Sequence, residues 1–234
     1  MDLELTGTTA VVTGASRGIG LATVRALAAE GVRVVGGART VTPELAEVAA
    51  ATVSADLSTA DGVHTLMDTA LGELGSIDIL INIVGAGDAD RFELGGFLDV
   101  DDEQWQALVD LNLFAAVRAS RAALPSLLER HGVIINVGSI NSRLPATGPV
   151  GYSEAKAALT TLSKRLSEEF GPGAYGSTPS HPASWAARCG ATPRASAARS
   201  PRRTASPTSS CWPRSPSRPA LRPAGSLSPR RSPH

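Results

Sequence analysis

Residues 8–30 read TTAVVTGASRGIGLATVRALAAE, and this stretch decides the fold. Residues 8–13 (TTAVVT) are short, apolar and rich in β-branched side chains, and Gly14 follows them, which is typical of a buried strand. Residues 18–30 (GIGLATVRALAAE) predict a helix that ends at Gly31. The chain therefore passes from a strand to a helix through a turn that is rich in glycine.

The same alternation of strand and helix continues to residue 170. Further strands are predicted at 32–37, 51–54, 77–84 and 132–138, and further helices near 60–74 and 102–130 and at 151–170. Continuous apolar strands that alternate with helices indicate a parallel sheet that is covered on both faces. The predicted fold class is therefore α/β, a doubly wound parallel sheet.

The first turn has the composition of a phosphate-binding turn. Its glycines let the backbone turn tightly and approach a pyrophosphate, while the helix N-terminus supplies N–H groups and the positive end of a dipole. The strand before it and the helix after it are the context that this motif requires. The alternative is a glycine turn that only packs a helix on a sheet. The candidate cofactor-binding residues are Gly14, Ser16, Arg17, Gly18, Ile19 and Gly20.

The end of the second strand indicates which dinucleotide is bound. Sites that prefer NAD usually place an acid here for the ribose 2′-hydroxyl, whereas this chain has Arg39, with Arg17 as a second cation. Two guanidinium groups favour a 2′-phosphate. We therefore expect NADP(H) to be preferred, with NAD(H) as the alternative; each arginine also has the alternative of a solvated surface side chain.

A second group of polar residues follows the fifth predicted strand. Tyr152 and Lys156 open a predicted helix, and their spacing of four puts the hydroxyl and the ammonium on one face, where the cation favours the phenolate. Ser139 stands thirteen residues before Tyr152, at the carboxyl edge where such sheets bind ligands. Taken singly, each of these residues is ordinary, so the joint pattern carries the inference.

The joint pattern resembles the short-chain dehydrogenase/reductase family over residues 5–170. The shared features, in the family's order and approximate spacing, are the glycine-rich turn, Asp56-Leu57 after the third strand, Asn82 in the fourth strand, Asn112 in the long helix, Ser139, and the helix with Tyr152 and Lys156. The resemblance implies a Rossmann fold and an oxidoreductase that transfers a hydride between NADP(H) and a small carbonyl or secondary alcohol.

The resemblance also implies a role for each residue. Tyr152 is the general acid/base for the substrate oxygen, Ser139 orients that oxygen, and Lys156 assists Tyr152 and holds the nicotinamide ribose. Asn112 anchors a proton-relay water. Asp56, next to Leu57, contacts the adenine, and Asn82 and Gly85 line the path of the cofactor. The family's usual assembly, a homodimer or tetramer, pairs the Asn112 and Tyr152 helices. Apolar residues that serve either this pairing or the core are Leu108, Leu111, Phe114, Leu159 and Leu162.

One departure from the family lies at the end of the fourth strand. The family usually has Asn-Asn-Ala-Gly there, and this chain has Asn82-Ile83-Val84-Gly85. The first asparagine and the glycine are kept, so the departure concerns the local loop geometry rather than the cofactor, which the backbone contacts there.

The composition changes abruptly after Phe170. The formal net charge of zero is the sum of −10 for residues 1–170 and +10 for residues 171–234, and the second part has ten arginines, 12 of the 16 prolines and no Val, Ile, Met or Phe. Such a segment has too little apolar surface to build a core. We therefore expect a dinucleotide-binding domain at 1–170, truncated after the fifth strand and sixth helix, and a basic low-complexity tail at 171–234.

A shifted reading frame explains this tail. The family continues after this point with a sixth strand and a turn of the type Val-Asn-x-Val-x-Pro-Gly, but residues 174–185 read AYGSTPSHPASW. Shifting the back-translated codons by two bases allows V-R-V-N-T-V-S-P-G-I-V, which is the missing segment. The hypothesis is that the chain from about Gly173 onward is out of frame in a GC-rich gene.

Several other classes are disfavoured. A tail that binds nucleic acid is an alternative, but its cations are thinly spread and its aromatic residues have no regular spacing. No apolar run approaches the length of a membrane span, and the acidic start is unlike a signal peptide, so a cytoplasmic protein is expected. Cys189 and Cys211 and the scattered histidines show no metal-binding spacing. A catalytically silent cofactor-binding or interaction protein is the alternative function, because the substrate-lid segment is missing.

Overall fold

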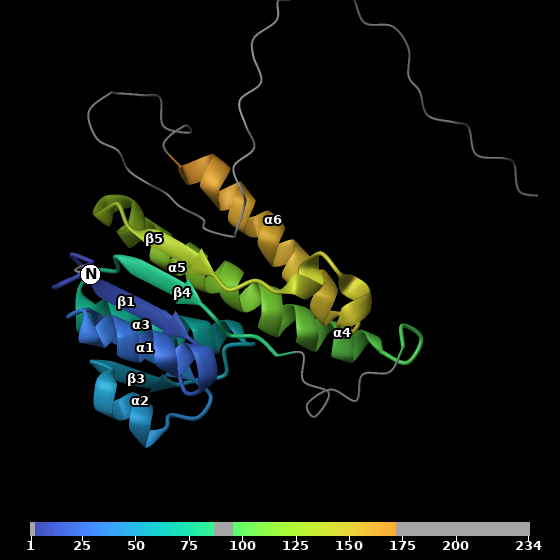
Figure 1. Ribbon diagram of the computed structural model, residues 1–234, viewed down its shortest axis with the longest axis horizontal. Coiled ribbons are helices and arrows are strands. Elements are labelled where there is room, and N and C mark those ends of the chain that lie inside the picture. The colour runs from blue at the N-terminus through green and yellow to red at the C-terminus, as the bar shows by residue number, and fades with distance from the viewer. Residues whose placement is uncertain (1–2, 87–95, 172–234) are drawn as a thin grey trace, which may run out of the picture. The chain divides into compact units, whose positions relative to one another are not determined.

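The computed structural model describes residues 3–86 and 96–171. Five parallel strands form one sheet in the order β3-β2-β1-β4-β5 (Figure 1). The strands are β1 (Thr9–Thr13), β2 (Arg33–Ala38), β3 (Ala51–Ser54), β4 (Ile79–Asn82) and β5 (Val133–Asn136). The order turns back between β1 and β4, and in open α/β sheets a ligand crevice lies outside the carboxyl ends of the strands at such a point. The doubly wound parallel sheet expected from the sequence is confirmed.

Helices connect the strands. They are α1 (Gly18–Ala29), α2 (Pro43–Val48), α3 (Ala60–Leu74), α4 (Asp102–Val109), α5 (Ala115–Arg130) and α6 (Tyr152–Phe170). The short helix α2 was not predicted from the sequence. Its signal in the sequence is Thr42-Pro43, because the Thr42 hydroxyl accepts a hydrogen bond from the N–H of Leu45 at 3.4 Å and a proline is suited to the first helical position.

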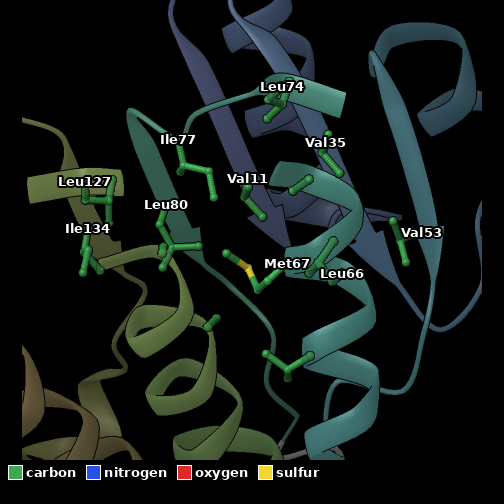
Figure 2. Close-up of a cluster of buried hydrophobic side chains, with 14 of the residues drawn as sticks. Val11, Val35, Val53, Leu66, Met67, Leu74, Ile77, Leu80, Leu127 and Ile134 are labelled. Atoms are coloured by element: carbon green, nitrogen blue, oxygen red, sulfur yellow. The ribbon is translucent and has the colours of Figure 1, made fainter. Parts of the chain in front are cut away.

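Two apolar layers cover the sheet, one on each face. Neighbouring residues of a strand point to opposite faces, so Val11 belongs to one layer and Val12 to the other. Figure 2 shows the first layer, in which Met67 of α3 lies near the strand residues Val11 and Leu80. The neighbouring Leu66 packs against Gly37 of β2. This packing holds the sheet rigid beneath the loops at its carboxyl edge.

The predicted long helix at 102–130 is interrupted. A π-helical turn at Asp110–Phe114 separates α4 from α5, and in it the N–H of Ala115 donates to the carbonyl of Asp110, five residues earlier. Asn112 lies in this turn and is 1 % exposed. Single π turns inside α-helices occur frequently at functional sites.

The amino edge of the sheet is fastened by a buried carboxylate. Asp78 Oδ2 accepts hydrogen bonds from the backbone N–H and the hydroxyl of Thr9, at 2.9 and 2.8 Å. Its Oδ1 accepts from Nε of Arg130 at 2.9 Å. Burial alone raises the pKa of Asp78, but these hydrogen bonds outweigh it and hold the pKa below its ordinary value. Asp78 thus ties β1, β4 and the end of α5 together.

Three of the residues considered for helix pairing belong to the core of this chain. Leu108, Leu111 and Leu159 are each no more than 3 % exposed within one chain, whereas Phe114 is 39 % exposed. Within 3–86 and 96–171, no helix has the length and apolarity that crossing a bilayer requires. The basic tail, its cysteines and the hypothesis of a shifted frame lie outside these residues.

Candidate functional site

A cavity of about 820 Å³ opens at the carboxyl edge of the sheet. Its walls come from the loops that follow β1, β2, β3, β4 and β5 and from the first turn of α6. The lining includes twelve residues expected from the sequence: Gly14, Ser16, Arg17, Gly18, Ile19, Gly20, Arg39, Asp56, Leu57, Gly85, Tyr152 and Lys156. The fold therefore brings the glycine-rich turn and the Tyr152 helix to one cavity.

The glycine-rich turn presents backbone to this cavity. Gly14 has φ +70°, a left-handed conformation that favours glycine, and a Cβ on Gly20 would collide with the carbonyl oxygen of Gly14. Arg17 precedes α1, its side chain does not cap the helix, and the first turn of α1 holds no acidic residue. The N–H groups and the dipole of α1 therefore face a site that suits an anion.

The loop after β2 forms the next part of the wall. Ala38, Arg39, Thr40 and Thr42 line the cavity there, and Ser54 Oγ donates to the Arg39 carbonyl at 2.9 Å. Thr42 Oγ1 also donates to the Ser16 carbonyl at 3.4 Å, which joins this loop to the glycine-rich turn. Thr40 and Thr42 are lining residues that the sequence analysis missed.

Asp56 follows β3 and lines the cavity. Its Oδ1 accepts from the N–H and from the hydroxyl of Ser58, at 3.0 and 2.8 Å. The carboxylate is thereby held in its own loop, beside Leu57, which is buried.

The departure from Asn-Asn-Ala-Gly is accommodated by the backbone. Thr13 Oγ1, at the end of β1, accepts from the N–H groups of Ile83 and Val84 at 3.0 and 3.2 Å. The side chain at position 83 takes no part in these bonds, so the segment after β4 is fixed with isoleucine there. Thr13 is a positioning residue that the sequence analysis did not identify.

Tyr152 and Lys156 start α6 and face each other. Lys156 Nζ lies 5.9 Å from the centre of the Tyr152 ring and donates to the Val137 carbonyl at 3.2 Å. Lys156 is 3 % exposed, and burial lowers its pKa from 10.5 to about 8. Gly151, with φ +82°, lets the chain turn into the helix, and its N–H donates to Glu154 at 2.7 Å.

Gly85 lies between Asn112 and Lys156. A Cβ on Gly85 would lie 2.7 Å from Asn112 Oδ1 and 3.0 Å from Lys156 Nζ, so no side chain fits there without displacing one of them. The backbone of this strand end therefore runs directly past the ammonium group.

Asn112 holds the loop after β4 by its side chain. Its Oδ1 accepts from the Ala86 N–H at 3.1 Å, and its Nδ2 donates to the carbonyls of Ala86 and Leu108, both at 3.0 Å. Both amide hydrogens are used in these bonds. Asn112 thus couples the π turn to the start of the loop that follows Gly85.

Three predicted residues are not among those that line the cavity: Asn112, described above, Ser139 and Asn82. Ser139 starts a short 3₁₀ turn, and its hydroxyl donates to Asn141 Oδ1 at 3.0 Å. Asn82 is buried, and its side chain points to residues of α5 and β5. There it donates to Ser120 Oγ at 3.3 Å and Asn136 Oδ1 at 2.8 Å, and its Oδ1 has no hydrogen-bond partner among the described residues.

The described part of the chain contains no group of three or more His, Cys, Asp and Glu residues placed to hold a metal ion. The chemistry of the cavity comes from backbone N–H groups, two arginines, a tyrosine and a buried lysine.

The sequence is similar to those of known proteins. The sequence model of the short chain dehydrogenases matches residues 8–174. A 3beta-hydroxysteroid dehydrogenase of Eggerthella lenta is 35% identical over 181 residues, which are 71% of this chain and 66% of that protein. A 3-oxoacyl-[acyl-carrier-protein] reductase of Synechocystis is 38% identical over 176 residues, 71% of this chain and 69% of that protein.

The fold is also similar to those of solved structures. The L-sorbose reductase of Gluconobacter frateurii, in complex with NADPH and L-sorbose, matches with a TM-score of 0.66 at 35% identity and covers 72% of this chain and 66% of that one. The chain thus spans a little under two thirds of the length of the Eggerthella protein and of the sorbose reductase, 66% in each case. From the match over residues 8–174 and these relatives, we conclude that the chain belongs to the short chain dehydrogenase family.

Proposed function

We propose that this protein transfers a hydride between NADP(H) and a small-molecule carbonyl or secondary alcohol, with Tyr152 as the general acid/base. One observation carries the proposal: the glycine-rich turn, Arg39, Tyr152 and Lys156 all line one cavity of about 820 Å³. Relatives named as reductases and dehydrogenases favour an enzyme over the catalytically silent alternative.

The residues present fit a dinucleotide. The close approach of Gly20 to Gly14 leaves no room for a side chain at position 20, so the backbone N–H groups there and the α1 dipole can face a pyrophosphate. Arg39, with Arg17, would hold a 2′-phosphate, and Asp56 and Leu57 lie where the adenine is expected. Lys156 would hold the nicotinamide ribose. A bound nicotinamide supplies or accepts the hydride.

The protein's own residues handle the proton. Tyr152 gives its hydroxyl proton to the substrate oxygen during reduction and takes it back during oxidation. The ammonium of Lys156, 5.9 Å from the ring centre, favours the phenolate form that this exchange creates. Ser139 donates a hydrogen bond to the same substrate oxygen, and Asn112 keeps Ala86, next to Gly85, in place. We also propose that Asn112 anchors a proton-relay water.

The preference for NADP(H) can be tested without a substrate. We expect the full chain to bind NADPH more tightly than NADH in a fluorescence titration. Arg39→Asp should weaken NADPH binding by roughly 10- to 100-fold, because it removes a charge-assisted contact and adds a repulsive charge. Arg121→Asp, an exposed position on α5, is the matched control and should leave both affinities unchanged. Equal affinities in the wild type, or equal effects of the two substitutions, would contradict the preference.

Turnover is tested with a panel of carbonyl compounds. The names of the relatives suggest L-sorbose, a 3-oxosteroid and a 3-oxoacyl thioester as probes. We expect NADPH oxidation by the full chain with at least one compound of this type. Absence of oxidation with a chain that binds NADPH would favour the silent alternative.

The tail and the assembly complete the proposal. We propose that the sequence from about Gly173 onward comes from a shifted frame, and the family match, which ends at residue 174, supports this. Resequencing the locus tests it: an intact frame that encodes the tail, shared by close relatives, would overturn it.

A homo-oligomer formed through α5 and α6 is also proposed. Phe114, which is 39 % exposed, would be an apolar residue of the contact. Light scattering of the full chain would measure the mass of the oligomer.

A further inference from the structure

Asn141 is the central member of a chain of hydrogen bonds that begins at Ser139. The Ser139 hydroxyl donates to Asn141 Oδ1 at 3.0 Å, and the backbone N–H of Asn141 donates back to Ser139 Oγ at 3.2 Å. Asn141 Nδ2 donates to Thr147 Oγ1 at 2.9 Å, and the Thr147 hydroxyl donates to the Leu144 carbonyl at 2.8 Å. The proton of Ser139 therefore points at the amide oxygen of Asn141.

The amide of Asn141 is confined on its other side. Gly148 has no side chain, and a Cβ there would collide with Asn141 Nδ2 and lie 2.5 Å from Asn141 Cγ and 2.8 Å from Ser153 Oγ. Its φ of −130° is open to any residue, so the glycine is needed for space alone. Asn141 therefore keeps one orientation because the backbone of Gly148 packs against its amide.

The same loop is attached to the helix that carries Tyr152. Ser153 is 2 % exposed, and its hydroxyl lies within hydrogen-bond distance of the carbonyls of Pro149 and Pro145, at 3.2 and 3.4 Å. The position of Asn141, and through it the Ser139 hydroxyl, is thereby linked to the first turn of α6. Asn141 is thus bonded to Thr147, and the loop on either side of Thr147 is bonded to Ser153 in the first turn of α6.

We propose that Asn141 is a positioning residue, whose side chain sets the direction of the Ser139 hydroxyl for the reaction. This proposal rests on the proposed function. Without substrate, the neutral amide oxygen holds the Ser139 proton. When a substrate oxygen lies beside Ser139, the proton turns to it, while the backbone N–H of Asn141 keeps Ser139 Oγ in place. A neutral acceptor releases the proton readily, whereas a carboxylate of the same shape retains it, because hydrogen bonds to charged acceptors are stronger.

Two substitutions separate positioning from a structural role. Asn141→Asp keeps the shape and places a carboxylate on the Ser139 proton, so kcat should fall roughly 10- to 100-fold near neutral pH. The loss should become smaller as the pH falls toward the ordinary carboxyl pKa of about 4, because the protonated acid is again a neutral partner. Asn141→Ala should lower kcat roughly tenfold by releasing the hydroxyl from its fixed direction. Neither change should alter the affinity for NADPH.

Turnover of the full chain is measured with NADPH and the compound of the panel that the wild type reduces fastest. In a Ser139→Ala background, Asn141→Ala should have no further effect on kcat, since Asn141 acts through Ser139. Ala146→Ser, at an exposed position of the same loop, is the matched control and should leave kcat unchanged. An Asn141→Asp enzyme as active as the wild type at every pH, or an equal effect of Asn141→Ala in both backgrounds, would overturn the proposal.

A second measurement needs no turnover. In ¹⁵N spectra of the full chain, the side-chain NH₂ pair of Asn141 is identified by its loss in Asn141→Asp. Ser139→Ala and Thr147→Val should each shift this pair, because each removes one of its amide's partners. An unshifted pair in Ser139→Ala would overturn the proposal even if the wild type proves inactive. A wild type without turnover but with the shift would refute the proposed function and leave the contact established.

Discussion

Lys156 is a charged group that the fold buries at a cost. Its ammonium is 3 % exposed, no salt bridge to it exists among the described residues, and its bond to Val137 is to a neutral carbonyl. A residue that lowers stability in this way is expected where a charge serves binding or proton transfer.

Replacement of Lys156 by methionine should therefore stabilise the protein at neutral pH. The pKa falls from 10.5 to about 8 on folding, so the unfolded chain binds more protons between these values and wild-type stability rises with pH across this window. Below pH 8 the burial cost is fully present, up to about 3 kcal/mol. Urea unfolding at pH 7 and above 9 checks this: the advantage of Lys156→Met should shrink as the pH rises.

Lys164→Met is the control for that comparison. Lys164 is 75% exposed and pairs with Glu168 across one helical turn at 2.6 Å. Such pairs contribute little to stability, so this substitution should change it by less than about 0.5 kcal/mol, without the same dependence on pH. A Lys156→Met protein less stable than the wild type at pH 7 would contradict the argument.

Gly85 gives a second test at the level of one residue. Gly85→Ala places a methyl group 2.7 Å from Asn112 Oδ1 and 3.0 Å from Lys156 Nζ, so turnover should fall about tenfold or more as these groups shift. Gly72→Ala is the matched control, because nothing lies within 4 Å of its Cβ position in α3. That change should leave turnover intact and stabilise the helix by up to about 1 kcal/mol. Similar turnover in Gly85→Ala and the wild type would show that this close approach is not required.

At the scale of elements, Asp78 joins β4 to β1 and to α5. Asp78→Asn puts an amide where the carboxylate accepted three hydrogen bonds, and we expect it to lower the free energy of unfolding by about 2–4 kcal/mol. The Thr9 contacts carry most of this effect, since the Arg130 side chain is 52% exposed. The folded pKa of Asp78 lies below its value of 3.8 in the unfolded chain, so this stability is fully present above that value and is lost as the pH falls through the folded pKa.

Denaturant unfolding at pH 7 and under acid measures this contribution. The difference between the wild type and Asp78→Asn should be largest near neutrality and shrink in acid. Glu168→Gln, at an exposed pair on α6, serves as the control and should cost less than about 0.5 kcal/mol. An Asp78→Asn loss no larger than the Glu168→Gln loss would show that the carboxylate does not fasten the sheet.

Elements with a strong periodic pattern were predictable, and those defined by side-chain contacts were not. Apolar runs such as 132–138 identify strands because both faces of this sheet are covered. The π turn at Asp110–Phe114 leaves the apolar pattern almost unchanged, so the sequence predicts one continuous helix. The structure shows the turn by the bond from the Ala115 N–H to the Asp110 carbonyl, next to the side-chain bonds of Asn112 to Ala86 and Leu108. The six-residue helix α2 is too short for its periodicity to be detected.

The same distinction applies to the candidate site. Spacing along the chain predicts that the glycine-rich turn and the Tyr152 helix share a cavity, because parallel strands bring their carboxyl ends to one edge. Spacing does not reveal where a side chain points. Asn82 ends β4 as expected but turns into the core toward Asn136. Ser139 likewise bonds to Asn141, a contact that no periodic pattern records.

At the scale of the whole molecule, the charge of zero combines two unlike parts. Residues 1–170 have a formal net charge of −10 and contain nearly all of the family match, which covers residues 8–174. Residues 171–234 have a formal net charge of +10. The described fold already includes the whole glycine-rich turn, the cavity and the residues proposed for catalysis. The resemblance to the family implies a further segment that covers the substrate, and the tail does not supply it. A version of the gene with the frame restored after Gly173 should therefore exceed this chain in turnover, with little change in the residues that bind NADPH. Equal rates of NADPH oxidation would refute a disabling effect of the tail.

We propose that one cavity binds NADPH and holds the acid/base that works with it. The most direct test follows NADPH oxidation and NADPH binding by the full chain and by Tyr152→Phe, with Tyr175→Phe, the chain's other tyrosine, as the matched control. We predict that Tyr152→Phe keeps its affinity for NADPH and loses turnover by about 10²- to 10⁴-fold, while Tyr175→Phe retains both. Turnover that survives in Tyr152→Phe, or a wild-type chain that does not bind NADPH, would contradict the account.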